Sequence, residues 1–216
     1  METKRTIGRI EAFVLAGGES SRMGRDKALL ELGGVTLIMR TVDLVLSVAR
    51  QCTIVGEAKR FDSGSADGTA KMSGMRVTAD DFPGAGPLGG IATALRASRS
   101  EWNLIVACDL PYLTREWLEF LVAGGLRSDA DVVLPMNERG AEPLCAMYRK
   151  RAGTAIREAL ARGTRKVTDG LAATRTEFIE PAEWKPFDSD GLLFKNMNSP
   201  ADYEEAKARC NASARR

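Results

Sequence analysis

The sequence contains no histidine, and this absence removes several kinds of catalysis at once. A Ser-His-Asp triad, a Cys-His nucleophile pair and an imidazole acid or base all need that side chain. Chemistry must therefore depend on carboxylates, lysine, arginine, backbone amides or a metal. The cysteines are widely spaced and form no CxxC pair, which indicates neither a disulfide framework nor a structural zinc site. We expect buried free thiols at Cys52, Cys108, Cys145 and Cys210.

Long apolar runs and a large charge of one sign are also missing. No run approaches the roughly 20 residues that a membrane span needs, and residues 1–9 have no apolar centre of the signal-peptide kind. We therefore expect a cytoplasmic protein. The 31 basic and 29 acidic residues leave a formal charge of +2, which attracts neither nucleic acid nor an anionic membrane. Any anion must be bound by a local group of residues.

Short apolar runs alternate with amphipathic segments along the chain. Residues 12–16, 52–55, 104–107 and 131–134 have the length and composition of buried strands. Between them, apolar residues recur at helical spacing, and this alternation predicts a mainly parallel sheet with helices on both faces. The helices expected are 37–49 and 117–122, then 152–162 and a last one after Ser199-Pro200; an edge strand is expected at 143–148, a short strand at 177–181 and an inserted loop at 58–74.

The first predicted strand leads into the sequence LAGGESSRMGRDK, residues 15–27. Its paired glycines let the backbone approach a ligand and turn N–H groups toward it, while the serines and cations add further donors. This set suits a nucleoside triphosphate, although the spacing matches neither the P-loop nor the dinucleotide motif. An ordinary charged turn is the alternative. The residues concerned are Gly17, Gly18, Ser20, Ser21, Arg22 and Lys27.

Carboxylates follow two further segments at the edge where open parallel sheets bind ligands. Asp109 in CDLP comes directly after a predicted strand, where it could hold Mg2+ or serve as a turn or N-cap residue. Asp80 and Asp81 precede FPGAGPLGGI, a glycine-rich loop that leads into a helix expected from Ile91. The amides of that loop could contact a base or a ribose, or the glycines could serve packing alone.

The segment FKNMNSPADY near the C-terminus combines two features. Asn196 and Asn198 are two residues apart, so their side chains point the same way in an extended backbone. The following SPAD is typical of a helix start, with serine as the N-cap and proline in the first turn. The helix start explains SPAD but leaves the two asparagines unexplained.

Four motifs taken together resemble those of the molybdenum cofactor guanylyltransferases, within the MobA-like nucleotidyltransferase family. They are LAGGESSRMGRDKALLELGG, GPLGGI, CDLP and NMNSPAD, and their order and spacing span nearly the whole chain. The resemblance implies one domain over residues 1–216, with its core at about 9–210, folded as a Rossmann-like three-layer α/β/α sandwich of the nucleotide-diphospho-sugar transferase type. It implies transfer of GMP from GTP to the terminal phosphate of molybdenum-carrying molybdopterin, with Mg2+ as cofactor and pyrophosphate as the second product. It also implies transient protein partners for cofactor handover, and neither nucleic acid nor membrane as a partner.

The resemblance also assigns roles to individual residues. One group lies along the nucleotide, with Lys27 on its phosphates and Asp80, or its neighbour Asp81, on the nucleoside. Asp109 holds Mg2+ and nucleotide. Apart from the resemblance, the positive charge and the amides of this stretch lead us to expect that Arg22, Lys27 and the Gly17 and Gly18 amides stabilise the leaving pyrophosphate. The resemblance places Leu15, Ala16 and Gly17 along the nucleotide and Asn196 and Asn198 on the pterin side; Gly18 joins the expected nucleotide-binding residues through its backbone amide.

One departure and three alternatives accompany this interpretation. After the second strand the chain has Gly56, where family members often carry an asparagine that touches the nucleotide. A molybdopterin cytidylyltransferase using CTP, and a nucleotidyltransferase for another phosphorylated cofactor, are alternative enzymes; LAGG and CDLP favour guanine by family pattern. A carrier that binds GTP without turnover is the alternative from a different class, although binding alone would not require a metal carboxylate such as Asp109.

Overall fold

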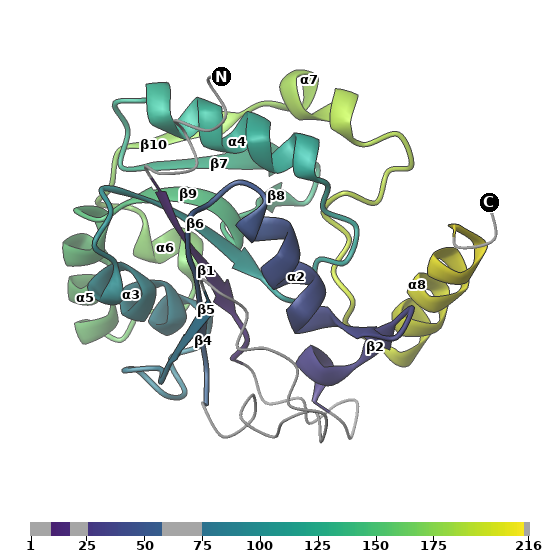
Figure 1. Cartoon of the computed structure of the whole chain (residues 1–216). Coiled ribbons are helices and arrows are strands. Elements are labelled where there is room, and N and C mark those ends of the chain that lie inside the picture. The colour runs from purple at the N-terminus through teal and green to yellow at the C-terminus, as the bar shows by residue number, and fades with distance from the viewer. Residues whose placement is uncertain (1–9, 18–25, 58–74, 214–216) are drawn as a thin grey trace.

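The computed structural model describes residues 10–17, 26–57 and 75–213, and its centre is an eight-stranded sheet (Figure 1). The strand order is β10-β7-β9-β6-β1-β4-β5, with β8 beside β7. Only β8 and β9 run against the other strands. The sheet is therefore mixed and mostly parallel. Its strands are β1 (Ile10–Leu15), β4 (Cys52–Val55), β5 (Met75–Thr78), β6 (Trp102–Ala107), β7 (Val132–Asn137), β8 (Gly140–Ala141), β9 (Cys145–Arg149) and β10 (Thr176–Ile179).

Helices cover both faces of this sheet, as the alternation of segments predicts (Figure 1). Alternate residues of β1 feed two different cores: Val14 packs with α2 and α4, whereas Phe13 packs with α3, α5 and α6. Both cores are apolar, since every residue of β1 but Glu11 is hydrophobic. The fold is a three-layer α/β/α sandwich. The helices are α2 (Leu37–Leu46), α3 (Pro87–Ala97), α4 (Arg115–Arg127), α5 (Ala152–Ala161) and α6 (Val167–Gly170).

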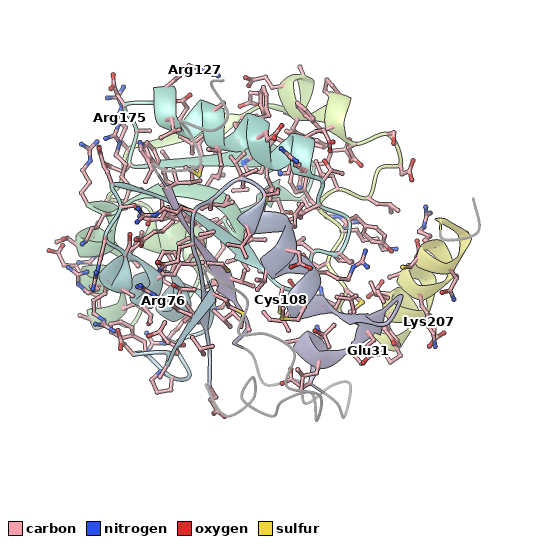
Figure 2. All side chains as sticks on the ribbon, in the orientation of Figure 1. Glu31, Arg76, Cys108, Arg127, Arg175 and Lys207 are labelled. Atoms are coloured by element: carbon pink, nitrogen blue, oxygen red, sulfur yellow. The ribbon has the colours of Figure 1, made fainter. Side chains whose placement is uncertain are left out.

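A smaller unit brings an early hairpin of the chain together with its last helix. The hairpin of β2 (Glu31–Leu32) and β3 (Val35–Thr36) packs against α8 (Pro200–Ser213), and the Tyr203 hydroxyl donates to the Glu31 carbonyl at 2.9 Å. Figure 2 shows Glu31 of β2 beside α8, the helix that carries Lys207. Before the hairpin lies the short 3-10 helix η1 (Lys27–Leu29), and before α8 lie α7 (Pro181–Trp184) and η3 (Lys185–Phe187). The hairpin therefore holds η1 and the start of α8 in one place.

Most expected elements are present, and three expectations were wrong in detail. The expected edge strand is β9, which lies inside the sheet between β6 and β7; Pro143 precedes the strand, so no ladder donor is lost. The helix expected from Ile91 begins at Pro87, and the strand expected at 177–181 ends at Ile179 because Pro181 opens α7. Residues 58–74 lie outside the described part.

Two further expectations concern the thiols and membrane spans. Cys52, Cys108 and Cys145 are buried free thiols as expected, whereas Cys210 on α8 is partly exposed. Burial raises the pKa of Cys52 to about 12, so this thiol stays protonated at neutral pH. Within the described residues, no helix has the length and apolar character to cross a membrane.

Candidate functional site

Three distant segments of the chain meet at the carboxyl ends of β1 and β6. Leu15 and Ala107 are register partners at the last position of these parallel strands. The Cys108 N–H donates to the Leu15 carbonyl at 3.2 Å, so the chain leaves both strands side by side. The Met197 N–H donates to the Asp109 carbonyl at 2.9 Å, which brings the late asparagine segment to the same edge. The carboxyl ends of the strands, where a ligand is expected to bind, therefore carry Asp109 and the Asn-Met-Asn sequence of residues 196–198 together.

Lys27 links the first motif to the last. Asp26 is the N-cap of η1, and its carboxylate accepts a hydrogen bond from the Ala28 N–H at 3.1 Å, which fixes the backbone around Lys27. The Lys27 Nζ atom donates to Asn198 Oδ1 at 2.9 Å across 171 residues of sequence. A residue expected on the phosphates and one expected on the pterin side are thus in direct contact.

Asp109 occupies a partly buried position close to Lys27. Burial raises the pKa of its carboxyl above the usual value, and the Lys27 ammonium and the residue's own N–H offset part of that rise. A carboxylate in such a place gains from a bound cation, since the cation replaces the hydration that burial removes. In the described residues no three His, Cys, Asp or Glu side chains gather as a metal site. One carboxylate with free coordination positions fits Mg2+, which retains waters and shares substrate phosphates.

The two late asparagines flank a buried anchor. Met197 is 1% exposed and packs with Leu32 and Leu37, while Asn196 and Asn198 are exposed on either side of it. This alternation is that of an extended backbone, as expected. Both asparagine side chains are therefore on the exposed side of the segment, next to Asp109.

The start of α8 holds this segment in position. The Asp202 carboxylate accepts from the N–H groups of Asn198 and Ser199 at 3.0 and 2.8 Å, and the Ser199 hydroxyl accepts from the Asp202 N–H at 3.2 Å. Hydrogen bonds from Ser199 and these backbone groups lower the pKa of Asp202. This reciprocal capping confirms the expected helix start and places Asn198 directly before it.

Asp80 and Asp81 are separated by their contacts, although they are adjacent in sequence. The Asp80 carboxylate accepts from the Phe82 N–H at 2.9 Å and from the buried Thr93 hydroxyl of α3 at 3.0 Å. Asp81 instead forms an ion pair with Arg96 on the outer side of α3. Asp80 is thereby fixed after β5, at the carboxyl edge of the sheet, whereas Asp81 is engaged in a surface ion pair.

The glycine-rich loop before α3 serves packing as well as exposure of the backbone. Gly86 precedes Pro87 with a φ of 68°, a left-handed conformation that a side chain would strain. A Cβ on Gly89 would lie 2.9 Å from the Phe82 carbonyl oxygen, so glycine allows α3 to approach the Asp80 loop. A Cβ on Gly90 would lie 3.3 Å from Leu15 Cδ2. The GPLGGI motif therefore joins the Asp80 loop to the end of β1.

The remaining expected nucleotide residues have unequal surroundings. Leu15 and Ala16 are buried, and the Ala16 N–H donates to the Val55 carbonyl at 3.0 Å. Gly17 is exposed, and no described atom lies within 4 Å of a Cβ placed on it. Gly56 donates its N–H to the Thr78 carbonyl at 2.9 Å, so that amide has a partner within the sheet. Gly18, Ser20, Ser21 and Arg22 lie outside the described residues.

Comparison with known proteins places this arrangement in a family. The family model described as the MobA-like NTP transferase domain matches residues 12–176. The chain belongs to the MobA-like NTP transferase family. It is 32% identical to the molybdenum cofactor guanylyltransferase of Desulfosudis oleivorans, over 94% of this chain and 96% of that protein. It is 33% identical to a protein of Carboxydothermus hydrogenoformans named a probable molybdenum cofactor guanylyltransferase, over 89% of this chain and 92% of that one.

A solved structure with the same fold supports the assignment to the MobA-like family. The crystal structure of molybdopterin-guanine dinucleotide biosynthesis protein A from Archaeoglobus fulgidus superposes with a TM-score of 0.79 at 27% identity. The match covers 94% of this chain and 99% of that one. The fold is thus the nucleotide-diphospho-sugar transferase type that the motifs implied.

Glu142 is a residue of this MobA-like chain that the sequence interpretation missed. Glu142 comes shortly before β9, the strand that pairs with β6, and it lies close enough to Asp109 for the two carboxyl groups to interact electrostatically. Burial raises the pKa of Glu142; its hydrogen bond from Asn137 and the nearby Arg139 lower it, and the charge of Asp109 raises it further. The signal was available only through strand pairing, because nothing in the local sequence of Glu142 marks it.

Proposed function

We propose that this protein transfers GMP from GTP to the terminal phosphate of molybdenum-carrying molybdopterin and releases pyrophosphate. The contact that carries the proposal is the 2.9 Å hydrogen bond from Lys27 to Asn198, beside the bond from Met197 to Asp109. It joins a cation suited to triphosphate, a carboxylate suited to a metal and an exposed amide pair at one sheet edge. Family membership and relatives named as guanylyltransferases support this substrate choice.

The reaction is a direct displacement at phosphorus, which needs charge stabilisation more than proton transfer. An oxygen of the acceptor phosphate, already anionic near neutral pH, forms a bond to the α-phosphorus of GTP. The bond from that phosphorus to the oxygen bridging the α- and β-phosphates breaks, and pyrophosphate leaves with the electron pair. No general base is required, so the absence of histidine is no obstacle.

Lys27 stabilises the negative charge that develops on the phosphates in the transition state. Its ammonium is held by Asn198 and lies near Asp109, so little reorganisation is needed when the nucleotide binds. The exposed backbone at Gly17 lies along the nucleotide, and Arg22 and Gly18 add donors to the leaving group. Asp80, fixed by Thr93, contacts the nucleoside.

Asp109 is the residue that holds Mg2+, as one protein carboxylate among phosphate and water ligands. When bound, Mg2+ neutralises charge on the phosphate oxygens. Asn196 and Asn198 face the acceptor side, where amide groups can donate to and accept from the polar edge of the pterin.

Pyrophosphate release and nucleotide transfer test this function together. The purified protein is given each of the four nucleoside triphosphates labelled at the α-phosphate, with Mg2+, in the presence and absence of molybdenum-molybdopterin. We expect label in a dinucleotide product with GTP only, and pyrophosphate release only when the acceptor is present. Transfer from CTP instead would identify a cytidylyltransferase, and tight GTP binding without any release would identify a carrier; either result contradicts the proposal.

A further inference from the structure

A hollow lined by cations lies at the end of the sheet where β6 begins, whereas Asp109 lies at the other end, where β6 finishes. It has a volume of about 700 Å³ and is bounded by the end of α3, the start of β6, the end of β9 and the start of α5. Because β6 has six residues, its two ends are about 20 Å apart, and a ligand in the hollow does not reach Asp109 or Lys27. The basic hollow, as we call it, is lined by the cations Arg96, Arg99, Arg149, Lys150, Arg151 and Arg157.

Half of these cations are already neutralised by carboxylates. Arg149 pairs with Glu101, the only acidic residue of the lining. Arg96 and Arg151 pair with aspartates outside the lining, namely Asp81 and Asp131. The remaining three cations, Arg99, Lys150 and Arg157, are not part of these ion pairs.

The other three cations have only neutral partners among the residues that the structure describes. The Lys150 Nζ atom donates to the Ser98 carbonyl at 2.7 Å, and Arg157 donates to the Thr154 hydroxyl at 3.3 Å. For the Arg99 guanidinium the described part of the chain offers no hydrogen bond or ion pair, although the Arg99 N–H donates to the buried Glu11 carboxylate at 3.0 Å. Even with the buried Glu11 carboxylate beside the Arg99 backbone, these three exposed cations leave a local excess of positive charge in a chain whose net charge is only +2.

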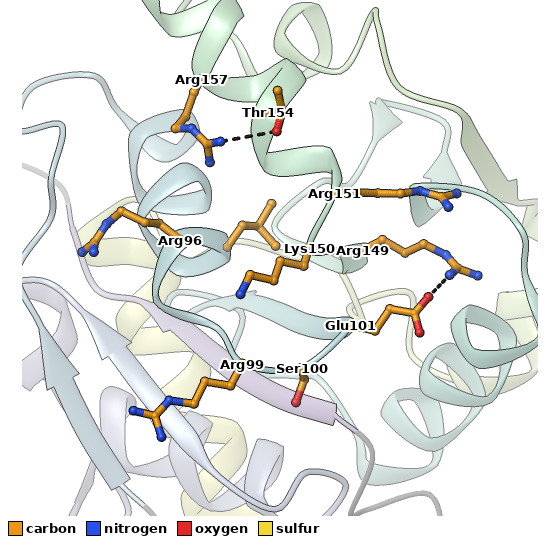
Figure 3. Close-up of a pocket in the computed structure, with 10 residues that line it drawn as sticks. Arg96, Arg99, Ser100, Glu101, Arg149, Lys150, Arg151, Thr154 and Arg157 are labelled. Carbon is orange, nitrogen blue, oxygen red and sulfur yellow. Dashed lines mark hydrogen bonds and ion pairs between the residues drawn. The ribbon is translucent and has the colours of Figure 1, made fainter.

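The floor of the basic hollow is held rigidly, while its mouth is open. The Arg149 guanidinium lies 4.6 Å from the centroid of the Trp102 ring and also donates to the Ser128 and Ala130 carbonyls. Figure 3 shows Arg149, Arg151 and Glu101 extending to one side, whereas Arg99 and Lys150 extend to the other. The unneutralised cations are exposed, so a partner can reach them without displacing the ion pairs.

The shape and the lining favour an acidic protein segment over a nucleotide. Among the described residues that line the hollow, Leu95 is the only apolar one, and none has an aromatic side chain on which a nucleobase could stack. The unneutralised cations come from three separate places, namely the loop after α3, the turn after β9 and the middle of α5. Such spacing suits several carboxylates along an extended segment better than one compact phosphate group.

We propose that the basic hollow docks an acidic segment of a partner protein. Docking at this edge leaves the edge with Lys27 and Asp109 open, so partner and substrates can bind at the same time. The proposal does not depend on the transfer reaction, since binding is measured without substrates.

Charge reversal at the mouth of the hollow tests the proposal. Binding of a fluorescein-labelled peptide in which glutamate alternates with serine is followed by fluorescence anisotropy at low salt. We expect Arg99→Glu with Arg157→Glu to weaken peptide binding roughly tenfold or more, and added salt to weaken wild-type binding. GMP transfer by this variant is expected to equal that of the wild type, and thermal unfolding checks that it folds.

A matched control makes the same change of charge at two cations outside the basic hollow. Arg50 and Lys207 are exposed and lie outside the hollow, so Arg50→Glu with Lys207→Glu is expected to change peptide affinity less than about twofold. An equal loss in this control would show a response to net charge alone and overturn the proposal. So would binding of inorganic tripolyphosphate that the peptide does not displace, or failure of the wild-type protein to bind the peptide.

Discussion

Lys27 and Asp109 are the side chains on which the proposed transfer depends most. Each supplies a charge contact in the transition state, and loss of one such contact costs about 3 kcal/mol of stabilisation. We expect Lys27→Ala and Asp109→Ala each to slow GMP transfer roughly a hundredfold or more with the fold intact. Lys27→Arg is also expected to impair transfer, because a planar fork replaces a compact ammonium. Steady-state rates of the purified variants measure this, and near-wild-type turnover by either alanine variant would remove the role assigned to it.

Asn198 is expected to act through Lys27 as well as on the acceptor. Because Asn198 Oδ1 accepts from Lys27 Nζ, Asn198→Ala removes this hydrogen bond and is expected to lower the rate of transfer. The effects of Asn198→Ala and Lys27→Ala are expected to be less than additive in the double variant, as for residues in direct contact. Asn196→Ala is the matched control for coupling, because it removes the other acceptor-side amide but leaves the hydrogen bond from Lys27 to Asn198 in place; its effect is expected to add to that of Lys27→Ala. Fully additive effects on the rate constants of a double-mutant cycle would show that the contact plays no part.

The sequence was sufficient to propose these side chains but not their contacts. Asp109 was expected at a strand end, and it lies directly after β6. The pairing of Lys27 with Asn198 spans 171 residues and depends on α8 packing against the β2–β3 hairpin, which no local pattern encodes. Glu142 was missed for the same reason, since it comes near Asp109 through the pairing of β9 with β6.

Helix α3 controls how the Asp80 loop sits against the sheet. A Cβ at Gly89 meets backbone at 2.9 Å, so Gly89→Ala is expected to destabilise the protein by about 1–3 kcal/mol and to raise the KM for GTP by shifting Asp80. Gly124→Ala in α4 is the control, because nothing described lies within 4 Å of its Cβ and alanine favours a helix. Thermal unfolding and GTP kinetics compare the two. Equal stability of both variants would contradict the close approach of α3 to this loop.

Asp131 joins three elements at the start of β7, and its contribution depends on pH. Burial alone would raise the pKa of Asp131, but hydrogen bonds from the Arg175 N–H and the Arg151 side chain outweigh it and hold the pKa below its usual value. Its stabilising effect is therefore complete above the ordinary pKa and is lost as pH falls through the lowered value. We expect Asp131→Asn to cost about 2 kcal/mol of unfolding free energy at pH 7.

The pH dependence separates the charge of Asp131 from other effects of the substitution. The difference between wild type and Asp131→Asn, measured by urea unfolding, is expected to shrink as pH falls below about 4, where the carboxyl of the unfolded chain protonates, and to disappear as pH falls through the lowered pKa of the folded protein. Asp129→Asn is the control, since Asp129 is exposed and only its backbone carbonyl contacts Arg151. A difference that stays constant from pH 7 to acid would contradict a charge-dependent role.

Elements with a strong local signal were predicted well, and those set by tertiary context were not. The run Cys52–Val55 is mostly apolar and buried along its whole length, and its bounds match the expected strand. The start of α3 was displaced because Gly86 and Pro87 form the helix start, while Gly89 and Gly90 lie within the helix as close-packing positions. Strand β9 was expected at an edge because Pro143 precedes it, but the proline lies outside the ladder.

Across the whole molecule, the two edges of the sheet have different charge and different expected partners. The carboxyl edge combines Lys27 and Asp109 with exposed asparagines and is proposed to bind nucleotide and acceptor. The opposite edge carries the basic hollow and is proposed to bind a protein segment. The alternation of strands and helices predicted the layers and the ligand edge. The basic hollow could not be predicted, since its cations are scattered over the sequence from Arg96 to Arg157.

A crystal structure with Mg2+ and a GTP analogue, in which a methylene group replaces the oxygen between the α- and β-phosphates, tests the central claim most directly. We expect the metal on the Asp109 carboxylate, the phosphates on Lys27 and along Gly17, and open space for the acceptor beside Asn196 and Asn198. Phosphates bound away from Lys27 and Asp109, for example in the basic hollow, would contradict the assignment of the carboxyl edge as the site of GMP transfer.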